Sequence, residues 1–413
     1  MKEIARNEGN NQLNIRKTEV VFLLAFFVYM SANTLDLTAV AFGQGNDRVS
    51  LINIFTKMAR YVAYILLAFK VICSNIYNRK WIKLFLDVSC VIAISFLGSF
   101  NKTIIFYLLI FIAACNVEEN YIIKISCAVQ SVILFVCVIG SRIGVIKDYV
   151  RQDGGRIRHF LGFSWTTTGA ILFVFILLQY IYLKKGKLSI WEDIIALGIS
   201  LYLYKMTNSR FAFLISIITI IIFAIYRLNV NNGRFIQKLK GVFIASPVVV
   251  AIFAILLHAF YNPQNTIYFQ LNKLLSGRLA LGQNAMSEYG ISLFGKDIEW
   301  IGFNMEETLR GTYNYVDCSY VKILLDHGIL FLGIVLLAYA YMLKKSIQKK
   351  QYYYTWILMI IMIFCITEPR LFDITFNPFI VLTLAGQKSI VDKNVKRGMG
   401  DAREYAKKRK YNA

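Results

Sequence analysis

Long apolar runs constrain this chain more than any other feature. Twelve such runs follow one another, each near the roughly 20 residues that a helix needs to span a bilayer. They lie at 19–38, 51–73, 81–99, 103–117, 121–141, 164–183, 188–205, 210–226, 241–261, 318–343, 352–367 and 371–387. A mean hydropathy of +0.54 and 57% apolar residues are also far from the composition of a soluble domain. The sequence therefore predicts an all-α, polytopic membrane protein with about twelve transmembrane helices.

Charges in the short loops predict the orientation of these helices. If the N-terminus is cytoplasmic, the loops at 79–80, 184–187, 227–240 and 344–350 return to the cytoplasm, and all are basic, as the positive-inside rule expects. Only the acidic turn at Glu118 and Glu119 departs from the rule. The first residues contain no small-residue cleavage site and are expected to be retained.

The expected organisation follows from these assignments. It is a cytoplasmic N-terminus (1–18), helices one to five (19–141), an arginine-rich outer loop (142–163), helices six to nine (164–261), a long outer loop (262–317), helices ten to twelve (318–387) and a basic cytoplasmic tail (388–413). Topology and attraction to anionic membrane lipid explain most of the formal charge of +22. Nucleic acid is therefore not expected as a partner.

Cysteine, histidine and glycine patterns in the sequence do not indicate disulfide, metal or nucleotide chemistry. The seven cysteines are scattered through the apolar runs, with no CxxC pair. The chain has no HExxH, Walker or GxGxxG motif. We therefore expect no disulfide framework, no metal site and no cofactor.

Arginines on the predicted outer face are the strongest indication of a binding site. They are Arg142, Arg151, Arg156, Arg158, Arg210 and Arg278. A membrane protein that carries so much positive charge on this face is expected to bind an anionic ligand there, with the two long outer loops holding it.

The second outer loop contains a helix-like stripe. Its members recur at spacings of three or four and are Leu271, Leu275, Leu279, Gly282, Met286 and Tyr289. This spacing predicts one amphipathic helix. Arg278 falls at the edge of the stripe, where it either reaches lipid headgroups or points into a site; the spacing alone leaves both open.

Four segments, taken in order, resemble a known family. They are RIRHFLGFSWTTTGA from Arg156, TNSRFAFL from Thr207, SGRLALGQNAMSEYGISLFG from Ser276 and VDCSYVKILLDHGILFLG from Val316. With the predicted topology, they resemble the O-antigen and capsular polysaccharide polymerases of the Wzy type. Those proteins are similar to the O-antigen ligases and are metal-independent membrane glycosyltransferases of the GT-C type.

The resemblance implies a reaction and a location. A glycan carried on a polyprenyl diphosphate, such as undecaprenyl diphosphate, would be transferred to a sugar hydroxyl of a second lipid-linked repeat unit. The reaction would take place at the outer leaflet of a bacterial plasma membrane. A flippase and a chain-length regulator would be possible protein partners.

The resemblance also implies roles for particular arginines. Arg210 matches the SR element and Arg278 the SGR element, while Arg156 and Arg158 match the basic residues before the LGF element. Guanidinium groups at these positions would bind the diphosphate and stabilise the charge of the leaving group. Which of Arg156 and Arg158 engages the diphosphate stays open.

The proton acceptor is assigned from the DxSY element, which Asp317 and Tyr320 match. Asp317 is predicted to deprotonate or orient the acceptor hydroxyl, and Tyr320 to share its helix face. The ligases usually have a histidine at the position of Asp317, so this departure favours a polymerase. His159 is a competing base.

Other charged residues receive predictions from their spacing. Lys57 and Arg60 have no carboxylate nearby in the sequence and are predicted to face the lipid-diphosphate cavity. Lys322 and Asp326, four residues apart, are predicted to form a structural ion pair. Glu368 and Arg370 flank Pro369 and are predicted to pair with each other.

Two other functions use the same features. A lipid-linked oligosaccharide flippase or other transporter could also have twelve helices and a cationic cavity, although we find no internal repeat between the two halves of the chain. An O-antigen-type ligase would share the fold and the donor but use another acceptor.

Overall fold

The computed structural model describes residues 2–42, 48–77, 89, 102–153, 155–228, 232–302 and 313–386. The predicted third helix at 81–99, apart from residue 89, and the basic tail lie outside the described residues. In the first half of the chain the helices are α1 (Lys2–Leu35), α2 (Ala39–Phe42), α3 (Arg48–Tyr77), α5 (Lys102–Ala113), α6 (Glu119–Arg142), α7 (Thr168–Leu183) and α8 (Ile190–Thr207). In the second half they are α9 (Arg210–Leu228), α10 (Asn232–Lys238), α11 (Lys240–Ala259), α12 (Thr266–Leu274), α13 (Arg278–Tyr289), α14 (Ser319–Gln348) and α15 (Tyr352–Phe364).

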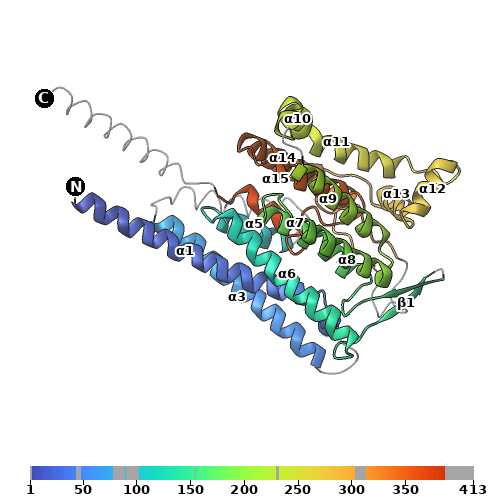
Figure 1. Cartoon of the computed structure of the whole chain (residues 1–413), viewed down its shortest axis with the longest axis horizontal. Helices are drawn as coiled ribbons and strands as arrows, with labels where there is room; N and C mark the ends of the chain where they lie inside the picture. The colour runs from blue at the N-terminus through green and yellow to red at the C-terminus, as the bar shows by residue number, and fades with distance from the viewer. Residues whose placement is uncertain are drawn as a thin grey trace.

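The long helices lie side by side in one bundle (Figure 1). The N-terminus is at one end of this bundle, and the hairpin strand β1 with α12 and α13 is at the other. Helix α7 forms the centre, because almost all its side chains are buried, and a helix that is apolar all round must be covered by its neighbours.

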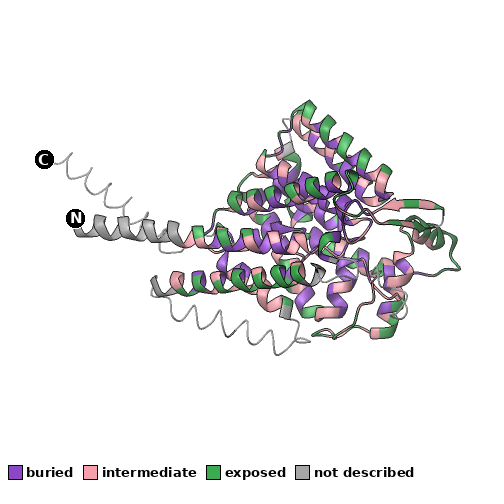
Figure 2. Cartoon of the chain, turned by 90° about the horizontal axis from the view of Figure 1, so that it is seen from below, coloured by how far each residue is buried: buried purple, intermediate pink, exposed green. Residues whose placement is uncertain are grey.

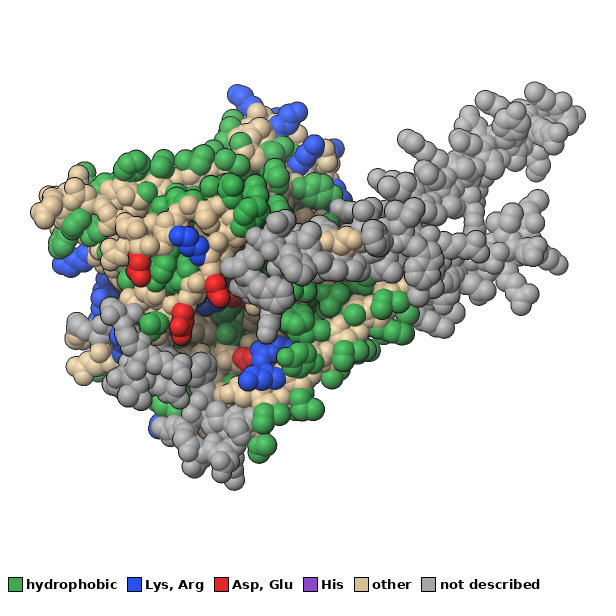
Figure 3. Space-filling view, turned by 180° about the vertical axis from the view of Figure 1, so that it is seen from behind, with side chains coloured by type: hydrophobic (Ala, Val, Ile, Leu, Met, Phe, Trp, Pro, Cys, Tyr) green, Lys and Arg blue, Asp and Glu red, His purple; other side chains and the backbone are tan. Residues whose placement is uncertain are grey.

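The described chain has the character of a membrane-embedded helical protein. Six of its helices are long and apolar enough to cross a membrane, and three shorter ones are also apolar. Buried residues lie toward the middle of the bundle, whereas exposed ones lie on its outer surfaces (Figure 2). Many exposed side chains are large and apolar, such as Phe55 and Phe135, and apolar side chains cover long stretches of the face seen in Figure 3. Lipid tails would cover such surfaces.

The prediction of a twelfth transmembrane helix at 371–387 is wrong. Over its described residues, 371–386, the segment is irregular apart from one 3-10 helix, Pro378–Thr383. Asn377 holds the irregular backbone by donating from Nδ2 to the Leu371 carbonyl oxygen at 3.0 Å and to the Tyr339 hydroxyl at 2.8 Å. The side chains of Phe379 and its neighbours are buried in the bundle. Non-helical backbone is tolerated at membrane depth when protein covers it in this way.

The outer loop at 262–317 holds two helices where the stripe predicts one. Ser276 (φ 57°) and Gly277 (φ 86°) both adopt left-handed backbone and separate α12 from α13. The Oδ1 atom of Asn272 accepts hydrogen bonds from the Leu279 and Ala280 amides at 3.0 and 3.2 Å. This side chain therefore caps the start of α13, and the break is a built turn that gives Arg278 the first position of a helix.

The same loop also interrupts α14. Gly328 has non-helical backbone (φ 82°, ψ 177°) inside the helix. The Ile329 amide donates to the Ser292 carbonyl oxygen at 3.1 Å, and the Lys296 amide donates to the Leu325 carbonyl oxygen at 2.9 Å. The loop backbone thus replaces hydrogen bonds that the kink removes from the helix.

The loop at 142–163 contains an antiparallel hairpin that the sequence did not predict. Strand β1 (Val150–Asp153) pairs with β2 (Arg156–His159), and Arg151 lies opposite Arg158. Asp148 fixes the return of the chain, because its Oδ1 accepts the Leu161 amide at 2.8 Å. The described part of the loop therefore forms a defined hairpin at the predicted outer end.

Long-range ion pairing explains the acidic departure from the positive-inside rule. Glu119 Oε1 lies 2.8 Å from Lys345 Nζ and 3.5 Å from Lys349 Nζ. The turn at Glu118 and Glu119 thus meets the basic end of α14, so its negative charge is neutralised by another loop on the same predicted side.

Candidate functional site

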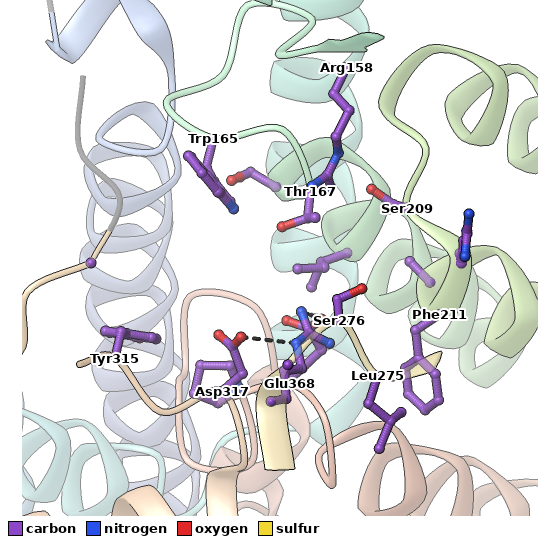
Figure 4. A pocket seen from close by; sticks show the side chains of 18 of the residues that line it. Arg158, Trp165, Thr167, Ser209, Phe211, Leu275, Ser276, Tyr315, Asp317 and Glu368 are labelled. Atoms are coloured by element: carbon purple, nitrogen blue, oxygen red, sulfur yellow. Dashed lines mark hydrogen bonds and ion pairs between the residues drawn. The ribbon is translucent and has the colours of Figure 1, made fainter. Parts of the chain in front are cut away.

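A cavity of about 600 Å³ opens between the hairpin and several helix ends (Figure 4). Most of its lining residues come from six parts of the chain: the hairpin (151–158), the start of α7 (164–171), the α8–α9 turn (208–212), the α12–α13 junction (274–281), the segment before α14 (313–317) and the turn after α15 (368–370). Each of the four family-like segments contributes to it. Segments that lie far apart in the sequence therefore meet at one cavity.

The lining is strongly cationic. Among the residues that the structure describes, six arginines line the cavity, against the two carboxylates of Asp317 and Glu368. The arginines are Arg151, Arg156, Arg158, Arg210, Arg278 and Arg370. Helices α7, α9 and α13 begin at the wall, so the positive ends of their dipoles add to this field. The arrangement favours an anionic ligand with several oxygen atoms.

Arg278 lies between the two carboxylates. Its Nε is 2.9 Å from Asp317 Oδ2, and its Nη2 is 3.0 Å from Glu368 Oε1. Burial opposes the charge of Arg278, but Glu368 and Asp317 together hold its pKa above the usual value. Burial raises the pKa of the Glu368 carboxyl to about 7, although Arg278 favours its ionised form. The three groups form one charged cluster on the floor of the cavity.

Arg210 is presented differently, because a turn at the end of α8 exposes it. Asn208 adopts left-handed backbone (φ 51°), which ends α8 and lets α9 begin at Arg210. The Thr207 hydroxyl donates to the Ser209 hydroxyl at 2.8 Å, both within the buried part of this turn. The guanidinium of Arg210 is exposed at the cavity wall, where it can reach a ligand.

The hairpin supplies three further arginines. Arg158 Nε donates to the Thr207 carbonyl oxygen at 2.9 Å, which ties the hairpin to the α8–α9 turn. Arg151 lies over the ring of Trp165, 5.2 Å from its centroid. Arg156 lines the cavity beside them. Trp165 and Tyr315 lie on one side of the cavity and Phe211 and Leu275 on the other (Figure 4).

The structure brings five of the predicted site residues together and leaves three elsewhere. Arg156, Arg158, Arg210, Arg278 and Asp317 line the cavity, whereas Arg60, His159 and Tyr320 do not.

Each of those three residues has another partner. Arg60, predicted to face the lipid-diphosphate cavity, does not line it and instead forms an ion pair with Asp36, which follows α1. The Nδ1 atom of His159 is 2.7 Å from Asp148 Oδ2, within the hairpin loop. The side chain of Tyr320 is fully buried, and its hydroxyl donates to the Met362 carbonyl oxygen at 2.9 Å. These contacts hold the fold and do not face the cavity.

Two predicted ion pairs have opposite outcomes. The pair between Lys322 and Asp326 is confirmed, with Nζ and Oδ2 3.1 Å apart. The predicted pair between Glu368 and Arg370 is wrong, because Glu368 pairs with Arg278 and Arg370 Nη1 is 2.7 Å from Asp373 Oδ2.

The turn after α15 lines the cavity although the sequence did not predict it there. Glu368 and Arg370 both line the cavity. A Glu-Pro-Arg tripeptide between two apolar runs was visible, and its charges at the predicted outer face were the available signal. Their closeness in the sequence predicts an ion pair between them, and such a pair gives no reason to place either residue at a site.

Within the described ranges, no group of three or more His, Cys, Asp or Glu side chains is arranged to hold a metal ion. Comparison of the chain with protein-family models, with characterised proteins and with solved structures finds no match.

Proposed function

We propose that this protein is a polysaccharide polymerase that joins polyprenyl-diphosphate-linked repeat units at the outer leaflet of the membrane. The observation that carries the proposal is the convergence of six arginines and two carboxylates at one cavity. A lipid diphosphate has the charge and the oxygen atoms that several guanidinium groups bind well. The family-like segments that supply Arg156, Arg210, Arg278 and Asp317 meet there.

The proposed reaction breaks the bond between the anomeric carbon and the diphosphate oxygen. The electron pair leaves with the lipid diphosphate, and arginines stabilise the negative charge that develops. The acceptor hydroxyl oxygen forms the new bond to the anomeric carbon and gives up its proton. A carboxylate of the cluster, Asp317 in the family-based assignment, orients this hydroxyl or accepts its proton.

The test of this proposal compares glycans from a deletion strain that carries the wild type, Arg210→Ala or Arg142→Ala, with membrane levels matched. Arg142 is the control: it is also on the predicted outer face, but it hydrogen-bonds to Tyr202 and does not line the cavity. We expect a ladder of long glycans from the wild type and Arg142→Ala. The deletion strain and Arg210→Ala should show single repeat units.

Other results would contradict the polymerase. Repeat units that collect inside the deletion strain would indicate a flippase. Free polymer that is made normally but not joined to its final acceptor would indicate a ligase.

A further inference from the structure

The turn after α15 holds Glu368 in a fixed position at the cavity. The Ser319 hydroxyl donates to the Glu368 carbonyl oxygen at 2.6 Å and accepts from the Leu371 amide at 3.0 Å. The Ser319 amide itself donates to the Cys365 carbonyl oxygen at 3.0 Å. The first residue of α14 thus fixes the backbone on both sides of Glu368. A proton-transfer group needs such a fixed position.

The two carboxylates of the cluster differ in their surroundings. The side chain of Asp317 is 20% exposed and that of Glu368 is 6% exposed, although both line the cavity and both contact Arg278. The charged groups that act on Glu368 are Arg278 from α13, Asp317 from the segment before α14 and Arg370 from its own turn. Burial outweighs the two arginines and raises the pKa of Glu368 to about 7. A carboxylate that titrates near the working pH is suited to accept a proton during the transfer.

We propose that Glu368 is the proton acceptor of the glycosyl transfer and that Asp317 positions Arg278. This inference rests on the proposed polymerase function. As the acceptor oxygen bonds to the anomeric carbon, its proton moves to a carboxylate oxygen of Glu368. The bond from the anomeric carbon to the diphosphate breaks, and its electron pair leaves with the lipid diphosphate. The protonated Glu368 then releases its proton to water before the next transfer.

The shared arginine couples donor binding to this step. Arg278 is the ion-pair partner of Glu368, and it also lines the cavity where the diphosphate is proposed to bind. Phosphate oxygens that take the N–H groups of Arg278 weaken its stabilisation of the Glu368 carboxylate. The proton affinity of Glu368 then rises. The base is therefore strongest when the donor is in place, and Asp317 keeps the guanidinium from leaving the cluster.

The test uses the full-length protein in nanodiscs and lipid-linked repeat units extracted from the deletion strain. Turnover is measured from pH 5.5 to 8.5 for the wild type, Glu368→Gln, Glu368→Asp and Asp317→Asn. Glu288→Gln is the control, because Glu288 is an exposed carboxylate of α13 that does not line the cavity. Binding of undecaprenyl diphosphate and the melting temperature are measured for each variant.

We expect the kcat/KM of the wild type and of the control to fall as the pH drops below about 7, because kcat/KM reports the ionisation of the protein without bound donor. Glu368→Gln should lose about 100-fold or more in kcat, the usual contribution of a general base, with undecaprenyl diphosphate bound within a few-fold of wild type. The residual rate of Glu368→Gln should lack the acid limb, which is the fall in rate as the pH drops below about 7. Glu368→Asp should recover part of both, and Asp317→Asn should keep the acid limb.

Two outcomes would overturn the inference in different ways. If the wild type polymerises and Glu368→Gln keeps its rate or its acid limb, Glu368 is not the base and the polymerase stands. If the wild type binds undecaprenyl diphosphate but forms no glycosidic bond, the proposed function fails and the role of Glu368 fails with it.

Discussion

Arg210 and Arg278 both line the cavity, but their partners give them different roles in stability. Arg278 is mostly buried and holds Asp317 and Glu368, whereas Arg210 is exposed. Removing one partner from a buried charge cluster destabilises a protein by about 3–5 kcal/mol, because the remaining charges stay buried without compensation. We therefore expect Arg278→Ala to lower the melting temperature of the purified protein clearly and Arg210→Ala to leave it near wild type. Equal melting temperatures would contradict the buried cluster.

The pH dependence of stability gives a second prediction for the same cluster. The pKa of Glu368 is raised from its usual 4.5 to about 7 in the folded protein, mainly by burial and against the effect of Arg278. The folded state therefore binds more protons than the unfolded state between these two pH values. The stabilising contribution of the protonated carboxyl is complete below pH 4.5 and is lost as the pH rises to about 7.

Glu368→Gln cannot ionise and should not show this loss. The melting temperature of the wild type relative to Glu368→Gln should decrease between pH 5 and pH 7.5. Glu288→Gln, a change at an exposed site, should follow the wild type throughout. A constant difference between the wild type and Glu368→Gln would contradict the raised pKa.

Individual residues also show where sequence-based prediction works. Arg156, Arg158, Arg210, Arg278 and Asp317 were selected by charge on a predicted face and by short family-like segments, and the structure places all five at one cavity. The wrong assignment of Arg60 depended on a partner that local spacing cannot show, because Asp36 lies on another helix end. The partner of Glu368 is likewise 90 positions away in the chain, at Arg278.

At the scale of elements, the contact between the outer loop and the kink in α14 depends on a glycine. Gly328 has a φ of 82°, and a Cβ added there would lie 2.3 Å from the Leu293 carbonyl oxygen. A backbone with φ 82° and ψ 177° is essentially restricted to glycine and costs a residue such as alanine about 1–3 kcal/mol, and the clash adds to this. We expect Gly328→Ala to separate the loop from α14, lowering the melting temperature and the polymer yield.

Gly333, one and a half turns further along the same helix, is the matched control. A Cβ there would meet nothing within 4 Å, so Gly333→Ala should be neutral or slightly stabilising. Equal effects of the two substitutions on melting temperature would show that the loop does not dock at the kink.

Elements were predicted best where periodicity is long and uniform. The apolar runs gave the helical character of the chain, but hydropathy does not distinguish a spanning helix from a buried irregular segment. The apolar side chains of 371–386 are mostly buried by protein, and Asn377 and Pro378 were the local signs against a helix. In the stripe from Leu271 to Tyr289, the apolar residues keep a helical spacing across Ser276 and Gly277. The helical backbone, however, is broken at these two residues.

At the scale of the whole molecule, the proposed reaction requires the cavity to open outside the cell. Six of the described helices have the length and composition to cross a membrane, and the basic turn at 184–187 is predicted to be cytoplasmic. Ser276 is exposed at the cavity, and Lys187 is exposed in that turn. In cells that express Ser276→Cys, a membrane-impermeant maleimide should label the protein from outside, whereas Lys187→Cys should react only after permeabilisation.

The native cysteines set the background of this labelling. Those in the described part of the chain are buried or half-buried, so labelling of the wild type measures what they contribute. Addition of undecaprenyl diphosphate to membranes should slow the labelling of Ser276→Cys, because the ligand occupies the cavity that this residue lines. The reverse pattern, with Lys187→Cys labelled in intact cells, would place the arginine-lined cavity in the cytoplasm. An outer-leaflet transfer would then be impossible, since donor and acceptor could not reach the arginines from the side where the glycans are joined.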